Sequence, residues 1–329
     1  MICFDLEGPL SPQDNAFEVM KLIRGGGKVF EALSQYDDIL ALQGREGYEP
    51  GDTLRLIVPF LVLHGVRAED IAGVSEKAGI VPGMAETVRW LREQGVEVRI
   101  ISTSYEQHAH TIGGRLGISP EATACTRLAL EELSFKPELM DSLKRIEAAI
   151  HSEGLSKEVI RMLDELYFTQ GLFDEIGVTV VGGQRKVDAL LAFAEAAGED
   201  VRDVAAVGDS ITDYKMLREV SGRGGLSIAF NANQYCLPYG DVGVATVDGR
   251  ALIPVIEAFL RGGRKGALDA VDILEEDMGA FEGDYSFLHD IEPRPLYTNL
   301  TGKGTPPEDV LKAHSRIRNL VRGEAGRLG

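Results

Sequence analysis

Cysteine is scarce in this chain. The 329 residues include 3 cysteines, and Cys3, Cys125 and Cys236 are far apart and form no CxxC pair. An odd number of widely separated cysteines predicts neither a disulfide framework nor a zinc site. We therefore expect three reduced thiols inside an intracellular protein.

Long hydrophobic runs are also missing. The longest apolar stretch, residues 54–65, is too short to span a bilayer and contains Arg55 and Pro59. The first apolar strand begins at residue 1, which leaves no room for the basic segment of a signal peptide. These features predict a soluble, cytoplasmic protein.

Basic residues are in the minority. The chain has 34 Lys and Arg against 52 Asp and Glu, a formal net charge of −18 and a pI near 4.8. Nucleic acids and anionic membranes would be repelled by such a surface, so we expect neither as a partner. The hydrophobic fraction of 44% is sufficient for a large globular domain with insertions.

Strand and helix patterns alternate along much of the chain. Residues 1–5, 96–104 and 204–210 have the composition of buried strands, while 83–95 and 185–198 have apolar side chains at helical spacing. Alternation of this kind is typical of α/β proteins with a parallel sheet and crossover helices. We expect a Rossmann-like, doubly wound parallel sheet.

Helical stretches interrupt this alternation twice. Residues 12–80 and 131–176 read as helical insertions, and Ser156 is an N-cap candidate within the second. A C-terminal extension, 264–329, ends in an amphipathic pattern over 307–322, which we expect to pack or to form a subunit contact. The catalytic core would then consist of three segments: 1–11, 81–130 and 177–263.

Four short motifs carry side chains suited to chemistry. They are "DLEGPL" with Asp5 and Glu7, "IISTS" with Ser102 and Thr103, "RK" with Lys186, and "GDSITD" with Asp209 and Asp213. In a doubly wound sheet, ligands bind beyond the carboxyl ends of the strands, near the point where the strand order reverses. We expect the four motifs to converge there.

These residue types fit phosphoryl transfer. A carboxylate such as Asp5 can attack a phosphoryl group and form an aspartyl-phosphate. Mg²⁺ is typically held by one or two carboxylates plus the substrate phosphate, which Asp5 and Asp209 could provide. Lys186 and Ser102 could hold the remaining phosphoryl oxygens.

In order and spacing, the four motifs resemble motifs one to four of the haloacid dehalogenase (HAD) superfamily. The resemblance is closest to the phosphoserine phosphatase-like branch and covers about 1–11, 81–130 and 177–260. It implies a HAD-like sheet with a helical cap at 12–80, inserted after the first strand. It also implies Mg²⁺-dependent hydrolysis of a small phosphorylated metabolite, with phosphoserine as the specific candidate.

The resemblance implies a role for each motif residue. Asp5 would be the nucleophile and a metal ligand, and Glu7 would contribute its main-chain carbonyl to the metal and its carboxyl group as acid and base. The phosphoryl group would be bound by Ser102, Thr103 and Lys186, and the metal would also be held by Asp209 and Asp213.

Three further positions bear on the resemblance: two are departures from the branch, and one matches its substrate site. Glu7 replaces the usual aspartate, and Thr212 stands where asparagine is frequent. Arg55 occupies the position where phosphoserine phosphatases place an arginine on the substrate carboxylate, a contact for which a guanidinium is well suited.

Simpler interpretations and other functions remain open at this point. Asp209 and Asp213 could cap a helix, and Arg55 could be a surface residue. The same motifs would serve a phosphotransferase that delivers the phosphoryl group to another hydroxyl. The chain also resembles archaeal proteins labelled energy-converting hydrogenase A subunit R, which implies a largely non-catalytic accessory subunit. Homo-oligomerisation, or docking to a larger complex through the C-terminal extension, is also left open.

Overall fold

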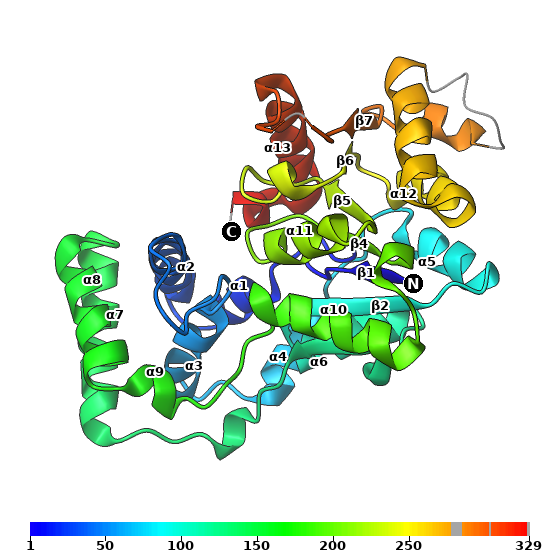
Figure 1. Ribbon diagram of the computed structural model, residues 1–329. Helices are drawn as coiled ribbons and strands as arrows, with labels where there is room; N and C mark the ends of the chain where they lie inside the picture. The colour runs from blue at the N-terminus through cyan, green and yellow to red at the C-terminus, as the bar shows by residue number, and fades with distance from the viewer. Residues whose placement is uncertain (278–284, 303, 328–329) are drawn as a thin grey trace.

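The computed structural model describes residues 1–277, 285–302 and 304–327. A seven-stranded sheet with the order β3-β2-β1-β4-β5-β6-β7 lies at its centre (Figure 1). The strands are β1 Ile2–Phe4, β2 Val98–Tyr105, β3 Thr123–Thr126, β4 Ala205–Gly208, β5 Leu226–Phe230, β6 Val242–Ala245 and β7 Leu296–Asn299. Neighbouring strands pair in parallel, except that β7 is antiparallel to β6. The predicted α/β class with a mostly parallel sheet is confirmed.

Helices fill the connections between these strands. Those that precede β4 are α1 Asn15–Met20, α2 Gly26–Leu42, α3 Thr53–Leu63, α4 Ala68–Glu76, α5 Met84–Glu93, α6 Glu106–Arg115, α7 Pro137–Glu153, α8 Lys157–Asp164, α9 Leu172–Glu175 and α10 Gln184–Ala197. Those that follow are α11 Tyr214–Gly222, α12 Ile253–Glu276 and α13 Glu308–Arg322. Among the described residues, no helix combines the length and hydrophobicity needed to cross a membrane.

The sheet is buried on both faces, which explains why its central strand is wholly apolar. Ile2 and Phe4 of β1 point into a cluster that includes side chains of α5, α6 and α12. Cys3, between them, joins a cluster on the other face with side chains of α10 and α11. A parallel sheet covered on both faces needs continuous hydrophobic strands rather than alternating ones.

The sheet order reverses at β1. The chain passes from β1 to β2 and β3 on one side, and then returns to place β4 on the other side of β1. Cys3 is in register with Arg99 of β2 and with Ala206 of β4. Asp5 and Asp209 follow the carboxyl ends of two adjacent strands at this reversal, where doubly wound sheets bind ligands.

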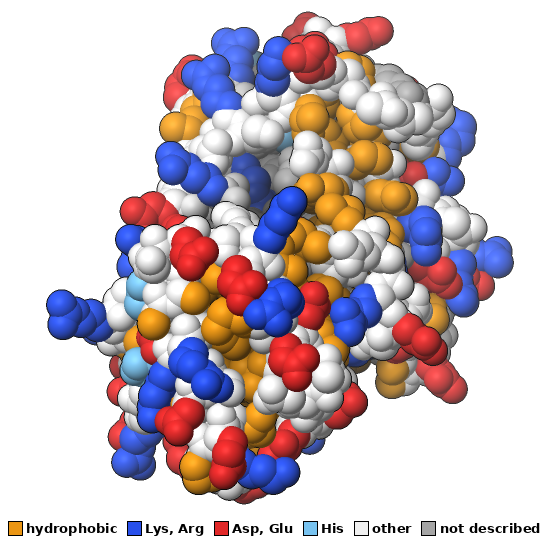
Figure 2. Space-filling model, turned by 90° about the vertical axis from the view of Figure 1, so that its left-hand side faces the viewer, with side chains coloured by type: hydrophobic (Ala, Val, Ile, Leu, Met, Phe, Trp, Pro, Cys, Tyr) orange, Lys and Arg blue, Asp and Glu red, His pale blue; other side chains and the backbone are white. Residues whose placement is uncertain are grey.

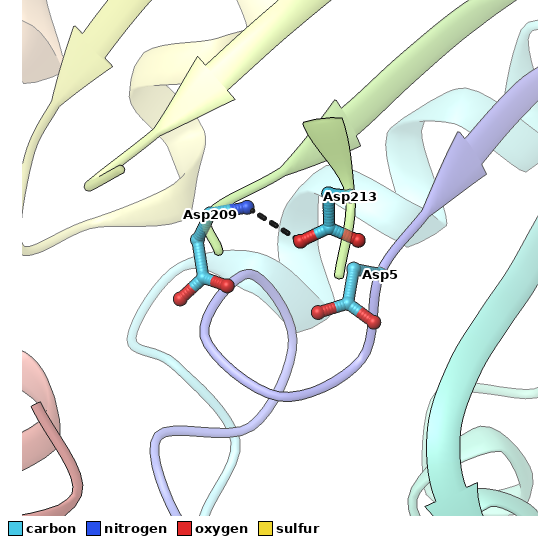
Figure 3. Close-up of side chains that lie close together, drawn as sticks. All are labelled: Asp5, Asp209 and Asp213. Atoms are coloured by element: carbon cyan, nitrogen blue, oxygen red, sulfur yellow. Dashed lines mark hydrogen bonds between the residues drawn. The ribbon is translucent and has the colours of Figure 1, made fainter. Parts of the chain in front are cut away.

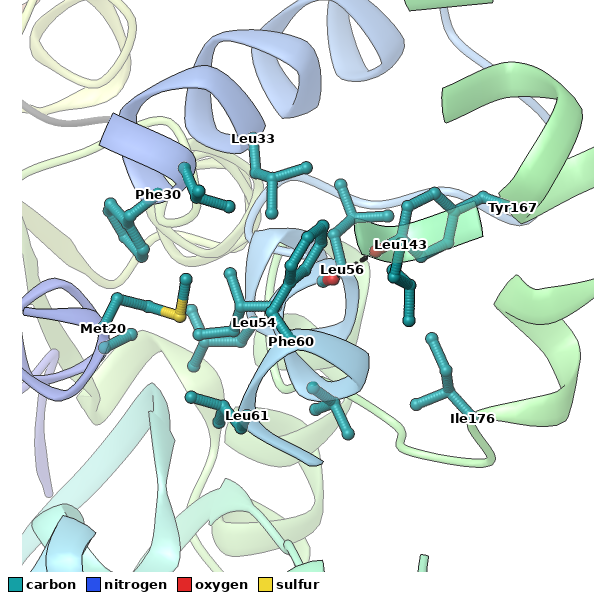
Figure 4. Close-up of a cluster of buried hydrophobic side chains, with 14 of the residues drawn as sticks. Met20, Phe30, Leu33, Leu54, Leu56, Phe60, Leu61, Leu143, Tyr167 and Ile176 are labelled. Carbon is teal, nitrogen blue, oxygen red and sulfur yellow. Dashed lines mark hydrogen bonds between the residues drawn. The ribbon is translucent and has the colours of Figure 1, made fainter. Parts of the chain in front are cut away.

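The two helical insertions share one hydrophobic cluster (Figure 4). α1 to α4 lie between β1 and α5, and α7 to α9 lie between β3 and α10. Leu56 of α3, Leu143 of α7 and Tyr167 are fully or almost fully buried together. The Tyr167 hydroxyl also donates a hydrogen bond to the carbonyl oxygen of Leu56. Segments that the sequence presents as separate insertions therefore pack as one helical unit.

The C-terminal extension packs on the sheet. α12 continues past the expected boundary at 263, with non-helical φ and ψ at Gly262 and Gly263 marking a kink. β7 then adds an antiparallel edge strand, and α13 contacts β6. The helix expected at 307–322 is present as Glu308–Arg322. The chain beyond the kink thus contributes directly to the central sheet.

Charges of both signs are interspersed on the face shown in Figure 2, the side on which α7 and α8 lie in Figure 1. Hydrophobic side chains lie between them. The excess of acidic residues therefore does not form a single acidic patch on this face.

The shared cluster predicts that the insertions stabilise each other. Leu143 is 0% exposed and Leu42, near the end of α2, is 64% exposed. We expect Leu143→Ala to lower the free energy of unfolding by about 2–5 kcal/mol, because it leaves a cavity in the cluster. Leu42→Ala should change it by less than about 0.5 kcal/mol. Urea denaturation followed by circular dichroism measures both values, and equal effects would contradict a shared core.

Candidate active site

Three carboxylates converge at the strand reversal (Figure 3). Asp5, Asp209 and Asp213 each place an oxygen within 4.8 Å of the others, and all three side chains are buried. Asp213 precedes α11 and accepts hydrogen bonds through Oδ2 from the backbone N–H groups of Asp209 and Ser210, both at 3.0 Å. It therefore caps the turn and belongs to the cluster at once.

Gly8 allows the chain after β1 to pass against this cluster. Its φ is +113°, and a Cβ at this position would lie 2.0 Å from Oδ2 of Asp209. A side chain would be both strained and in collision there. The glycine of "DLEGPL" is thus required by the closeness of two segments that are distant in sequence.

Lys186 is the cation of the cluster. It is 0% exposed, and its Nζ lies 2.6 Å from Oδ1 of Asp5 and 2.7 Å from Oδ1 of Asp213. Burial alone would lower the pKa of Lys186, but the carboxylates of Asp213 and Asp5 outweigh it and raise the pKa. The two carboxylates therefore favour the charged form of Lys186.

Lys186 pairs with two of the three carboxylates, Asp5 and Asp213. Burial, and then repulsion from Asp213, raise the pKa of Asp5 well above its usual value. Oδ1 of Asp209 is buried and has no hydrogen-bond partner among the described residues. Three converging carboxylates with one unpartnered oxygen form a ligand set that suits a divalent cation such as Mg²⁺, so the residues fit the metal that the motifs imply.

Glu7 reaches past the cluster to the start of α1. Its Oε1 accepts hydrogen bonds from Oγ of Ser104 at 2.6 Å and from the backbone N–H of Asn15 at 3.0 Å. The pKa of Glu7 is raised by burial, against the effect of these two bonds. The extra methylene is accommodated because the carboxyl group is anchored on both β2 and the helical insertion.

A small cavity of about 80 Å³ opens beside these groups. It is lined by Asp5, Glu7, Ser102 and Thr103, among others. Thr212 also lines the cavity, and its Oγ1 lies 3.0 Å from Oγ of Ser210. The volume is sufficient for several water molecules or a group of phosphate size.

Two further acids line the cavity from the helical insertion. Burial, and then the nearby Glu7, raise the pKa of Asp14 to about 7. Burial also raises the pKa of Asp37 to about 7, although its carboxylate accepts hydrogen bonds from Tyr48 and from backbone N–H groups. The wall opposite the sheet therefore carries two acids beside the apolar side chains of Phe30 and Leu54.

Arg55 is not brought to this cavity. Its guanidinium carbon lies 3.8 Å from the ring centroid of Phe173, and Nη2 lies 3.7 Å from Asp174. Arg55 is absent from the cavity lining. The second insertion covers this part of α3, so the arrangement does not support the expected contact between Arg55 and a substrate carboxylate.

Sequence reasoning missed two arginines of α13. Arg318 donates through Nη1 to Oδ2 of Asp209, and also to its carbonyl oxygen at 3.2 Å. Arg322 donates through Nη1 to the same Oδ2 at 2.9 Å, and both arginines line the cavity. Their four-residue spacing on one helix face was visible in the sequence, but nothing there indicated that the helix lies over the motifs.

Solved structures with the same fold include phosphoserine phosphatases. One in apo form is 18% identical, covers 77% of this chain and 96% of its own, and has a TM-score of 0.51. A phospho-aspartyl intermediate analogue of phosphoserine phosphatase is 20% identical with the same coverage and a TM-score of 0.52. The chain therefore shares its fold with phosphoserine phosphatases, as the motifs predicted.

A closer relative spans the whole chain. The gene product AF1437 from Archaeoglobus fulgidus is 30% identical, covers 100% of this chain and 98% of its own, and has a TM-score of 0.85. The chain belongs to the family of this gene product. No protein-family model matches the sequence, and no curated protein does.

The lysine at the centre of the cluster provides a test of this geometry. We expect Lys186→Met to lower the free energy of unfolding by about 3–5 kcal/mol, because it leaves two buried carboxylates without their cation. The matched control is Lys265→Met, since Lys265 is 82% exposed and pairs with Asp269 on the surface. The control should change stability by less than about 0.5 kcal/mol in the same urea titration. Similar losses in both variants would contradict the geometry.

Proposed function

We propose that this protein is a Mg²⁺-dependent phosphomonoester hydrolase that acts through an aspartyl-phosphate on Asp5. The observation that carries the proposal is the position of Asp5. It follows β1 at the sheet reversal, borders a phosphate-sized cavity and is hydrogen-bonded to Lys186. The fold shared with phosphoserine phosphatases supports the same reaction class.

The metal would be held by the carboxylates of Asp5, Asp209 and Asp213, together with the carbonyl oxygen of Glu7. When bound, Mg²⁺ would offset the negative charge of the carboxylates and of the phosphoryl group. The unpartnered Oδ1 of Asp209 supports this assignment.

In the first step, a carboxylate oxygen of Asp5 attacks phosphorus, and the bond to the leaving oxygen breaks. Glu7 donates a proton to that oxygen. Ser104 and Asn15 both bind Oε1, so we assign the transferred proton to Oε2. Anchoring one oxygen while leaving the other open is suitable for directed proton transfer.

In the second step, Oε2 of Glu7 takes a proton from a water molecule that attacks the aspartyl-phosphate. Inorganic phosphate leaves and the Asp5 carboxylate is restored. Lys186 does not itself line the cavity, and two of its three N–H donors bind Asp5 and Asp213. We assign it to holding Asp5, and its third N–H would be offered to a phosphoryl oxygen bound at Asp5. Ser102, which lines the same cavity, can donate its hydroxyl proton to another.

The substrate we propose is a small phosphorylated metabolite, with phosphoserine as one candidate. A cavity of about 80 Å³ supports a phosphoryl group with little attached to it. Larger leaving groups would require the helical insertion to move away from the sheet, as capping elements do in many enzymes. The phosphotransferase alternative stays a prediction, since the same residues serve hydrolysis and transfer. The accessory-subunit alternative also stays a prediction.

The decisive experiment is a phosphate-release assay over a panel of phosphorylated metabolites with Mg²⁺. Asp5→Asn should lower kcat by at least about 10³-fold on any substrate found, because the nucleophile is lost. The matched control is Asp141→Asn, since Asp141 is 70% exposed. A wild-type protein that releases no phosphate from any compound would refute the proposal, and an active Asp5→Asn variant would refute the nucleophile.

Metal removal gives a second prediction. Dialysis against EDTA should reduce phosphate release at least about 10-fold, and added Mg²⁺ should restore it. Ca²⁺ should restore less, because it prefers longer oxygen distances and more ligands than this cluster offers. The measurement is the initial rate at a fixed substrate concentration, and a rate insensitive to EDTA would count against a metal-dependent step.

A further inference from the structure

α13 is held on the sheet by contacts that fix its rotation. Val310 and Ile317 are buried, and His314 is 0% exposed. Nδ1 of His314 accepts a hydrogen bond from the backbone N–H of Ala232 at 3.0 Å. A Cβ at Gly243 of β6 would lie 3.0 Å from Nε2 of His314, so the helix approaches the strand where a side chain is missing. The face bearing the two arginines is therefore directed at Asp209.

Both arginines are themselves anchored. Arg318 is 2% exposed, and its Nε donates to the carbonyl oxygen of Gly326 at 3.1 Å. Nε of Arg322 donates to the carbonyl oxygen of Pro12 at 3.3 Å. A guanidinium with several fixed hydrogen bonds directs its remaining N–H groups more accurately than a mobile one.

The distribution of bonds on Asp209 is uneven. Oδ2 accepts from Nη1 of both arginines, while Oδ1, also buried, has no hydrogen-bond partner among the described residues. If the arginines served only to neutralise a buried carboxylate, we would expect their hydrogen bonds to be divided between its two oxygens. Instead, one oxygen is tied down and the other is left open beside Asp5 and Asp213.

We propose that Arg318 and Arg322 are positioning residues, which hold Oδ2 of Asp209 so that Oδ1 is presented as a single metal-binding oxygen. The C-terminal extension would then be an integral part of the metal centre, supplied from more than 100 residues along the chain. Hydrogen-bond partners of metal-binding side chains commonly set ligand orientation and affinity. This inference rests on the metal centre of the proposed function, but metal binding can be measured without any substrate.

The test uses Mn²⁺ as the probe, because it accepts the same oxygen ligands and its free form is seen by electron paramagnetic resonance. We expect Arg318→Gln in the full chain to raise the Kd for Mn²⁺ by about 10–100-fold. Arg316→Gln is the matched control, since Arg316 is exposed on the same helix. It should leave the Kd within about 2-fold of wild type. Displacement of bound Mn²⁺ by Mg²⁺ should rank the variants in the same order of Kd.

Arg318→Lys separates position from charge. Lysine keeps the positive charge but not the guanidinium fork, so its Kd should also exceed that of wild type. If the arginines acted through charge alone, Arg318→Gln would bind Mn²⁺ more tightly than wild type, because a repelling cation is removed. Tighter or unchanged binding in Arg318→Gln therefore overturns the inference.

A loss of metal binding must be distinguished from a loss of folding. Far-UV circular dichroism verifies that each variant folds. Should Arg318→Gln not fold, Arg322→Gln takes its place, with weaker binding expected because it removes a bond to the same Oδ2. A wild-type protein that binds neither Mn²⁺ nor Mg²⁺ would refute the metal centre of the proposed function. Normal binding in both wild type and variant would refute only the positioning role.

Discussion

The site depends on the electrostatics of three carboxylates gathered at one edge of a buried sheet. Carboxylates in a low-dielectric interior are costly unless cations and hydrogen-bond donors meet them. Lys186 comes from α10, which lies between β3 and β4, and arginines come from α13 beyond β7. Each crossover therefore has to return an element to the same edge, and the topology of the sheet is what makes this charge arrangement attainable.

The helical unit above the sheet is attached through residues that also line the cavity. Its entry is fixed by Glu7, whose carboxyl group binds the first residue of α1, and by Asp14, which caps that helix through the N–H of Phe17. Its interior is provided jointly by two insertions that are more than 50 residues apart in sequence. The cavity wall comes from the first insertion, which packs against the second. Changes in either insertion can therefore alter the cavity without altering the motifs on the sheet.

Much of the arrangement could be predicted because it follows from local patterns. Strand and helix periodicity identified the sheet, and four motifs identified Asp5, Lys186 and the aspartates that the structure brings together. Their individual roles in chemistry are still proposals. The strand ends could be placed at one edge because parallel strands share their direction.

What could not be predicted depends on how distant surfaces meet. Arg318 looked like any charged residue of an amphipathic helix, since its partner is 109 residues away. Arg55 matched a family position in sequence, yet Phe173 of the other insertion lies against it. In both cases the helix was predicted, and its neighbour was decided by packing that no local pattern encodes.

The guanidinium of Arg322 also links the carboxylate cluster to the segment that enters the helical unit. Arg322 holds Asp209 through Nη1 and the carbonyl oxygen of Pro12 through Nε, and Pro12 begins the segment that leads into the helical unit. Any swing of that unit that widens the cavity must either carry this side chain along or break one of its bonds. Widening of the cavity and the geometry of Asp209, the metal ligand that we propose, would thus be coupled.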